Sequence, residues 1–125
     1  MHERKQRPMT LKIKFKSDYN DDIEGEIKRT IYVNHPEAIA LIVYAKSEYG
    51  NFMEVYQKIT VNLNDTVQKD GKTVFLDTKK MDKELLKEVE RFGNYTGDER
   101  KSGFMTYHAF RFFDFALEQM NEAGK

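Results

Sequence analysis

The residues with the most potential for chemistry lie between Arg91 and Phe104, in the stretch RFGNYTGDERKSGF. Its glycines and the pair Lys101-Ser102 suggest a phosphate-binding loop, in which backbone N–H groups and a helix N-terminus converge on a phosphate. Such a loop needs G-x-x-x-x-G-K-[ST] between a strand and a following helix. Here Arg100 stands before Lys101, and a helix is expected to enter the stretch and a strand to leave it. We therefore expect no nucleotide site.

Other candidate sites for chemistry are sparse. His2, His35 and His108 are far apart, and none lies one helical turn from another, so no histidine metal site is predicted. The acidic segment DYNDDIEGE is similar to a calcium loop, but Ile23 stands where the sharp-turn glycine belongs. We interpret this segment as an acidic loop in solvent. We predict no catalytic residue, no cofactor and no metal ion.

One enzymatic hypothesis stays open. His108 lies among aromatic residues and is a candidate general base, with Asp77 and Tyr107 as the partners it would need. No nucleophile is visible beside it, and such a histidine more often lies at the rim of a core. The dense aromatic run from Phe104 to Phe115 is expected to be mostly core. Any part of it left exposed would mark a contact surface.

The composition limits the classes of protein. The chain has 125 residues, which suits one domain, and no cysteine, which excludes disulfides and cysteine nucleophiles. Basic and acidic residues both number 21, and a net charge of zero argues against a dedicated nucleic-acid binder. No apolar run approaches a membrane span, and the N-terminus lacks the apolar region of a signal peptide. We expect a cytoplasmic protein that makes no membrane contact.

The charge is unevenly distributed along the chain. Basic residues dominate residues 1–17, whereas residues 18–26 carry acidic residues and no basic one. The basic block Arg4–Lys16 supports a second hypothesis, weak contact with nucleic acid, to which Arg100 and Lys101 would add. Residues 1–9 hold too few apolar side chains to offset their ordering entropy, so we expect a mobile basic arm there. Residues 10–125 are expected to form a single domain.

Periodicity predicts the elements that must position these residues. Leu11, Ile13 and Phe15 alternate with lysines, which indicates a strand with one buried face, and a second strand follows and pairs with it. Two further β-type runs flank the turn SEYGN and are expected to form a hairpin. The predicted strands after the first are residues 26–34, 37–46, 52–64, 73–78 and 103–113.

Two helices are expected to pack on these strands. The first is Lys83–Phe92, with Asp82 as its N-cap and Gly93 as a left-handed C-terminal cap, and the second is Asp114–Glu122. The predicted fold class is α+β, an antiparallel sheet of about five or six strands with two helices packed on it. Ile59 and Phe104 are expected in its core.

Three segments together carry a family resemblance: KITVNLND, KTVFLDTKK and GNYTGDERKSGFMTYHAF. They resemble an uncharacterised family of small proteins, a domain of unknown function, from conjugative elements and phages of Gram-positive bacteria. The pattern T-V-N-L, F-x-D-T, G-x-x-T-G and S-G-F with a tyrosine occurs here at residues 60–63, 75–78, 93–97 and 102–104 with Tyr107. The resemblance covers about residues 37–110. It implies a mobile-element context and no activity.

The predicted function is that of a small non-enzymatic protein-binding factor, acting as an accessory or anti-defence protein. The small size, the high charge density, the lack of a catalytic set and the mobile-element context that the resemblance implies all favour this function. Binding residues concentrate on loops held by rigid elements, and Tyr and Arg are enriched at binding hot spots. We therefore predict a partner-binding loop over residues 93–103, anchored by Tyr95 and Arg100 and flanked by Asn94 and Lys101. A connector without function explains this loop equally well. Weak nucleic-acid binding through the basic N-terminal segment is the alternative function.

Overall fold

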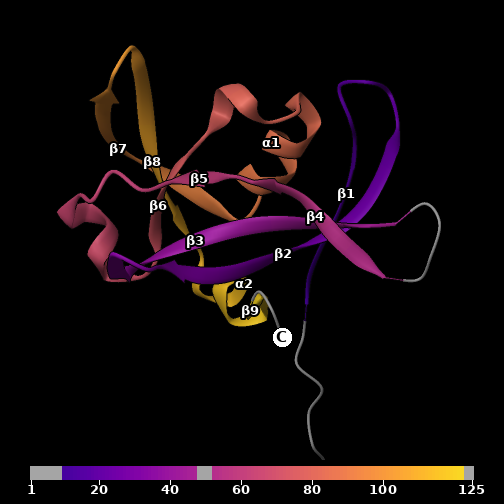
Figure 1. Cartoon of the computed structure of the whole chain (residues 1–125), viewed down its shortest axis with the longest axis horizontal. Coiled ribbons are helices and arrows are strands. Elements are labelled where there is room, and N and C mark those ends of the chain that lie inside the picture. The colour runs from indigo at the N-terminus through magenta and orange to yellow at the C-terminus, as the bar shows by residue number, and fades with distance from the viewer. Residues whose placement is uncertain (1–9, 48–51, 123–125) are drawn as a thin grey trace, which may run out of the picture.

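The computed structural model describes residues 10–47 and 52–122, with the backbone alone at residues 121 and 122. The arm predicted for residues 1–9 lies outside this part of the chain. The elements, shown in Figure 1, are β1 (Leu11–Lys16), β2 (Asp22–Tyr32), β3 (His35–Lys46), β4 (Met53–Lys58), β5 (Thr60–Val61), the 3-10 helix η1 (Thr66–Asp70), β6 (Thr73–Leu76), the 3-10 helix η2 (Thr78–Lys80), α1 (Lys83–Glu90), β7 (Gly93–Ser102), β8 (Met105–Phe112), α2 (Asp114–Gln119) and β9 (Asn121–Glu122).

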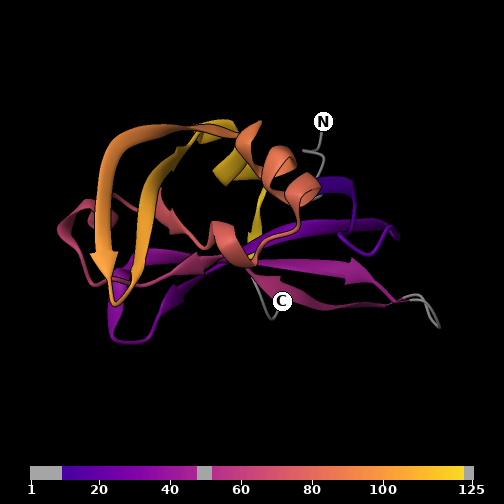
Figure 2. The same cartoon turned by 90° about the horizontal axis from the view of Figure 1, so that it is seen from above.

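The described strands form two sheets, so the prediction of one sheet of five or six strands with two helices on it is wrong. The large sheet has the order β1-β2-β3-β4, with the short β9 paired to β2. The small sheet has the order β5-β6-β8-β7. Figure 2 shows α1 and α2 over the same face of the large sheet. Both helices are short, and the fold is mostly β rather than α+β.

The link between the sheets explains this error. Residues 53–61 were expected within one strand, but β4 pairs with β3 in the large sheet and β5 pairs with β6 in the small sheet. Between them, the N–H of Ile59 donates to the carbonyl of Leu41 at 3.0 Å, and its own carbonyl accepts from the N–H of Asp77 at 2.9 Å. The Ile59 side chain is fully buried, which confirms its predicted place in the core. An alternating pattern does not reveal that a strand changes sheets.

The strand pairings predicted for the first half of the chain are confirmed. β1 pairs antiparallel with β2 from Leu11↔Ile27 to Lys16↔Asp22, and β3 pairs antiparallel with β4 as the predicted hairpin. The inward side chains of β1 join the core with those of β3, β8 and α1. The largest fully buried members of the core include Ile27, Leu41, Ile59, Phe75, Leu76, Leu85, Phe110 and Phe112.

The helix boundaries differ from the prediction at their C-terminal ends. Asp82 is the N-cap residue of α1 as expected, but α1 ends at Glu90 with Arg91 as a right-handed cap. Gly93 is therefore not a left-handed cap; it begins β7, where an added Cβ would lie 2.3 Å from the carbonyl oxygen of Arg111. α2 ends at Gln119, because the chain then turns into β9. No helix in the described residues is long and apolar enough to cross a membrane.

Candidate functional site

The stretch predicted as a loop, residues 93–103, is mostly the edge strand β7. It pairs antiparallel with β8 from Gly93↔Phe112 to Ser102↔Met105, with an irregularity between Tyr95 and Glu99. Nearly all of its side chains are exposed, because β7 lies at the sheet edge in a hairpin that projects from the body (Figure 1). The polar composition that indicated a loop therefore reflects an exposed strand.

Tyr95 braces this hairpin against α1. Its hydroxyl donates a 2.5 Å hydrogen bond to Oε2 of Glu90, and its ring meets the buried ring of Phe110 edge-on at 5.0 Å between centroids. Burial, together with the bond to Glu90, raises the pKa of Tyr95 well above its ordinary value. The side chain is still 44% exposed. It therefore supports the hairpin and also presents a free surface.

Arg100 braces the hairpin at a second point. Its Nε donates to Oδ2 of Asp65 at 2.8 Å, and its Nη1 donates to the carbonyl of Glu99 at 2.9 Å. Asp65 is the N-cap of η1, where its other carboxylate oxygen accepts from the N–H of Val67. The bond from Val67 and the Arg100 guanidinium lower the pKa of Asp65. Arg100 thus joins β7 to the start of η1.

The tip of the hairpin presents an unpaired aromatic side chain. Ser102 pairs with Met105, which leaves Gly103 and Phe104 as a two-residue loop, and Gly103 has φ +64°. A glycine at the first loop position is typical of a type II′ hairpin turn. Phe104 is fully exposed, so its predicted place in the core is wrong. The Gly-Phe pair between two β-type runs was the signal that could have placed it correctly.

The remaining predicted site residues lie on the same strand. Asn94 and Lys101 are both exposed, and no ion pair joins Lys101 to another residue of the described chain. The structure therefore brings all four predicted residues onto one hairpin. It does not bring Asn94 to the tip, because Asn94 pairs with Arg111 near the base, whereas Lys101 pairs with Thr106 beside the turn.

Two of the residues of the enzymatic hypothesis, Tyr107 and His108, do not face the same site. Tyr107 and His108 are neighbours on β8, so their side chains point to opposite faces of the small sheet. His108 lines a hollow of about 350 Å³ with Leu86 and Asp98 among others. Asp77 is buried at the end of β6, and its Oδ1 has no hydrogen-bond partner among the described residues. No group of three or more metal-ligating side chains gathers in the described ranges.

The acidic segment, residues 18–26, is part loop and part strand, and its loop part makes hydrogen bonds to the start of α1. Only residues 17–21 form the turn, because Asp22–Glu26 belong to β2. Asp18 accepts the backbone N–H of Lys83 at 3.1 Å and donates its own N–H to Asp82 at 2.8 Å. The hydroxyl of Tyr56 donates to the other oxygen of Asp82 at 2.9 Å. This network joins the β1–β2 turn, β4 and α1.

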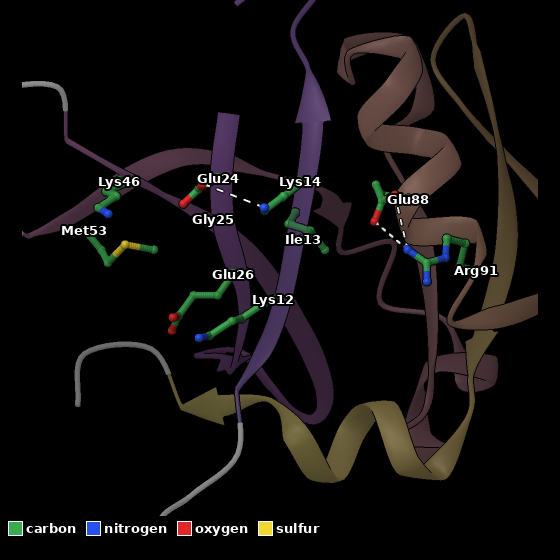
Figure 3. A pocket seen from close by; sticks show the side chains of 10 residues that line it. All are labelled: Lys12, Ile13, Lys14, Glu24, Gly25, Glu26, Lys46, Met53, Glu88 and Arg91. Atoms are coloured by element: carbon green, nitrogen blue, oxygen red, sulfur yellow. Dashed lines mark hydrogen bonds and ion pairs between the residues drawn. The ribbon is translucent and has the colours of Figure 1, made fainter. Parts of the chain in front are cut away.

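The lysines of the predicted basic block lie along β1 on the face of the sheet away from the core. Lys14 lies 3.9 Å from Glu24 and Lys16 lies 3.1 Å from Asp22 across the β1–β2 pair. A hollow of about 540 Å³ opens beside them, and Figure 3 shows Lys12 and Lys14 from β1 together with Lys46 from β3 among its lining. The rest of the block, residues 4–9, lies outside the described residues.

Residues 17–124 match a protein family described as a domain of unknown function, DUF4313. The chain belongs to this family. The match includes β2 and α2, which lay outside the resemblance over residues 37–110, and it confirms the predicted domain of unknown function. No curated protein and no solved structure matches the chain.

Proposed function

We propose that this DUF4313 protein is a non-enzymatic protein-binding factor whose contact element is the β7–β8 hairpin. The observation that supports the proposal most strongly is the fully exposed Phe104 at the hairpin tip. Aromatic residues are enriched at protein interfaces, and those that act as hot spots fill a pocket of the partner. An aromatic ring at a projecting tip is well placed to enter such a pocket.

The two braces make this tip suitable for binding. Tyr95 fixes β7 to α1, and Arg100 fixes it to η1. A hairpin that is already ordered loses less conformational entropy when it binds, so more of the contact energy becomes affinity. Tyr95 and Arg100 are predicted anchors of the partner as well, through the parts of their side chains that stay exposed.

The charge beside the tip supports a proposal for the chemistry of the partner. Lys101 is exposed and pairs with Thr106, one step from the turn, whereas the Arg100 guanidinium is already bonded to Asp65. An exposed ammonium group that has no ion pair within the described residues, on the same hairpin as an exposed apolar ring, is complementary to an apolar pocket with an acidic rim. We therefore expect a protein partner with such a pocket.

The proposal also includes a biological setting. The resemblance to proteins of conjugative elements and phages supports a role as an accessory or anti-defence factor of a mobile genetic element. The absence of cysteine suits action in the reducing cytoplasm. In that setting the partner would be a protein of the host or of the element.

The test compares two exposed apolar side chains at the tips of different hairpins. Val33, in the β2–β3 turn, is 91% exposed and serves as the matched control for Phe104. Tagged wild-type chain, Phe104→Ser and Val33→Ser are used to capture proteins from a nuclease-treated lysate of the native host. Captured proteins are identified by mass spectrometry, and their affinities are then measured with purified components.

We expect a protein that binds the wild type and Val33→Ser but is lost with Phe104→Ser, while all three chains have the same circular dichroism spectrum. Equal capture by Phe104→Ser would show that the tip makes no contact. Loss with both variants would show that capture depends on general apolar adhesion, which would also contradict the proposal.

A further inference from the structure

The face of the large sheet away from the core carries an excess of positive charge. In strands, alternate side chains share a face, and β1 buries Leu11, Ile13 and Phe15 toward the core. The strand register then places the outward residues side by side. The outward basic residues are Lys12, Lys14, Lys16, Lys28, Lys46 and Lys58, and the outward acidic residues on the same strands are Asp22, Glu24 and Glu26.

Half of these lysines are not neutralised by a carboxylate. Lys14, Lys16 and Lys28 each lie within 4.0 Å of one of the three acidic residues. Lys12, Lys46 and Lys58 have no ion pair with any residue of the described chain, and all three are exposed. Lys58 lies over the ring of Tyr32, at 5.5 Å from its centroid, which leaves its charge uncompensated. The face therefore presents three free ammonium groups on three strands.

An apolar strip lies between these ammonium groups. Tyr44 of β3 pairs directly with Val55 of β4, which is 61% exposed. Two positions further along the ladder, and so on the same face, Lys46 pairs with Met53. Lys12, Lys46 and Met53 also line the hollow of about 540 Å³ in Figure 3. Lys28 lies 4.8 Å from the centroid of the Tyr44 ring, so the half-buried aromatic surface is itself next to a cation.

We propose that this face binds single-stranded nucleic acid, independently of the hairpin. Free lysines on a sheet surface suit phosphate contacts, and an apolar or aromatic surface between them suits unstacked bases. A duplex would offer its phosphates but keep its bases inside, so the Tyr44–Val55 strip would have no role. The net charge of the whole chain is zero, so long-range attraction is weak, and the binding is weak and salt-dependent.

The test is fluorescence anisotropy of the full chain with a labelled oligothymidine, longer than the roughly 4–16 nucleotides that one small domain covers. The test variant carries Lys12→Gln, Lys46→Gln and Lys58→Gln. A control variant carries Lys69→Gln, Lys79→Gln and Lys83→Gln, which removes the same charge from exposed positions on η1, η2 and α1. Thermal unfolding followed by circular dichroism checks that both variants keep the fold.

We expect the wild type to bind with an affinity that falls as salt rises. The test variant should bind at least about tenfold more weakly, and its salt slope should be smaller by about 2, since each lost phosphate contact removes about 0.7. The control variant should stay within about threefold of the wild type. The absence of binding at low salt, or an equal loss in both variants, would overturn the proposal. Equal affinity for a duplex of the same length would overturn the assignment to single strands.

Discussion

Helix α1 makes a tyrosine–carboxylate hydrogen bond at each of its ends, and the two bonds differ in their surroundings. At the start of the helix, Tyr56 bonds to Asp82, which is buried and also accepts the N–H of Asp18. At the end of the helix, Tyr95 bonds to Glu90 near the surface, and Tyr95 is 44% exposed. The first bond belongs to a network around a buried carboxylate that joins the β1–β2 turn, β4 and α1, whereas the second supports a projecting hairpin.

The difference shows that the same kind of hydrogen bond can stabilise the domain in one place and orient a hairpin in another. The net effect of a hydrogen bond on stability depends mainly on what its loss leaves unpaired. Without Tyr56, a buried carboxylate oxygen loses its partner and stays away from water. Without Tyr95, the Glu90 carboxylate is free to bond to solvent. We therefore assign the Tyr56 bond to the stability of the domain and the Tyr95 bond to the direction of the hairpin.

The strongest contrast between interior and hairpin is expected at two apolar residues. Ile59→Ala should lower the free energy of unfolding by about 2–5 kcal/mol, because it leaves a cavity where the chain passes from one sheet to the other. Phe104→Ala should change it by less than about 0.5 kcal/mol, because the ring is fully exposed. Urea unfolding measures both. Similar midpoints for the two variants would contradict the assignment of interior and tip.

An intermediate effect is expected from Tyr56→Phe, which removes the hydroxyl and keeps the ring that meets Phe15 edge-on at 5.5 Å. The free energy of unfolding should fall by about 1–2 kcal/mol, because Asp82 loses one of its partners in a buried place. Urea unfolding at neutral pH measures the change. A loss below about 0.3 kcal/mol would show that the network does not depend on this bond.

The pH dependence of the same variant provides an independent control. Burial, followed by the hydrogen bond to Asp82, raises the pKa of Tyr56 from 10.0 to about 12. Because the fold favours the neutral phenol, its contribution to stability is complete below about pH 10 and is lost as the pH rises through about 12. The wild type should therefore lose more stability across this range than Tyr56→Phe. Parallel curves for the two proteins would show that Tyr56 does not titrate in this way.

The smallest effect on stability is expected from Tyr95→Phe. It should change the free energy of unfolding by less than about 0.5 kcal/mol, because Glu90 gains water in place of the hydroxyl. The hairpin should nevertheless lose one of its two braces. Hydrogen exchange of the β7 and β8 amides should become faster, and the affinity for the protein partner should fall. Unchanged exchange would show that Arg100 alone is enough to hold the hairpin.

Local patterns were sufficient for much of the fold. Alternation predicted β1 and its pairing with β2, and the turn after residue 46 predicted the β3–β4 hairpin. Helical spacing of apolar residues predicted α1. The assignment to one sheet failed at Ile59, because hydrogen bonds to Leu41 on one side and Asp77 on the other depend on segments distant in sequence.

The sequence predicted the residues of the candidate site but not the conformation of the segment that carries them. Tyr95 and Arg100 do lie on one hairpin, but their partners Glu90 and Asp65 were not predicted. Asp65 is 35 positions away from Arg100, and no periodicity connects them. Phe104 was placed in the core because aromatic residues usually are buried, and the Gly103 turn beside it outweighs that tendency.

The edge of β2 is shared by two elements that are far apart in the sequence: β1 pairs with Asp22–Ile27, and β9 pairs with Lys28 and Arg29. This arrangement has a consequence for folding during synthesis. The β1–β4 segment leaves the ribosome early and can form its hairpins at once, because its contacts are local. The positions of β2 that receive β9 must wait until β9 itself has been made, more than 90 residues later. The nascent protein therefore exposes part of a strand edge to other chains until β9 has been translated.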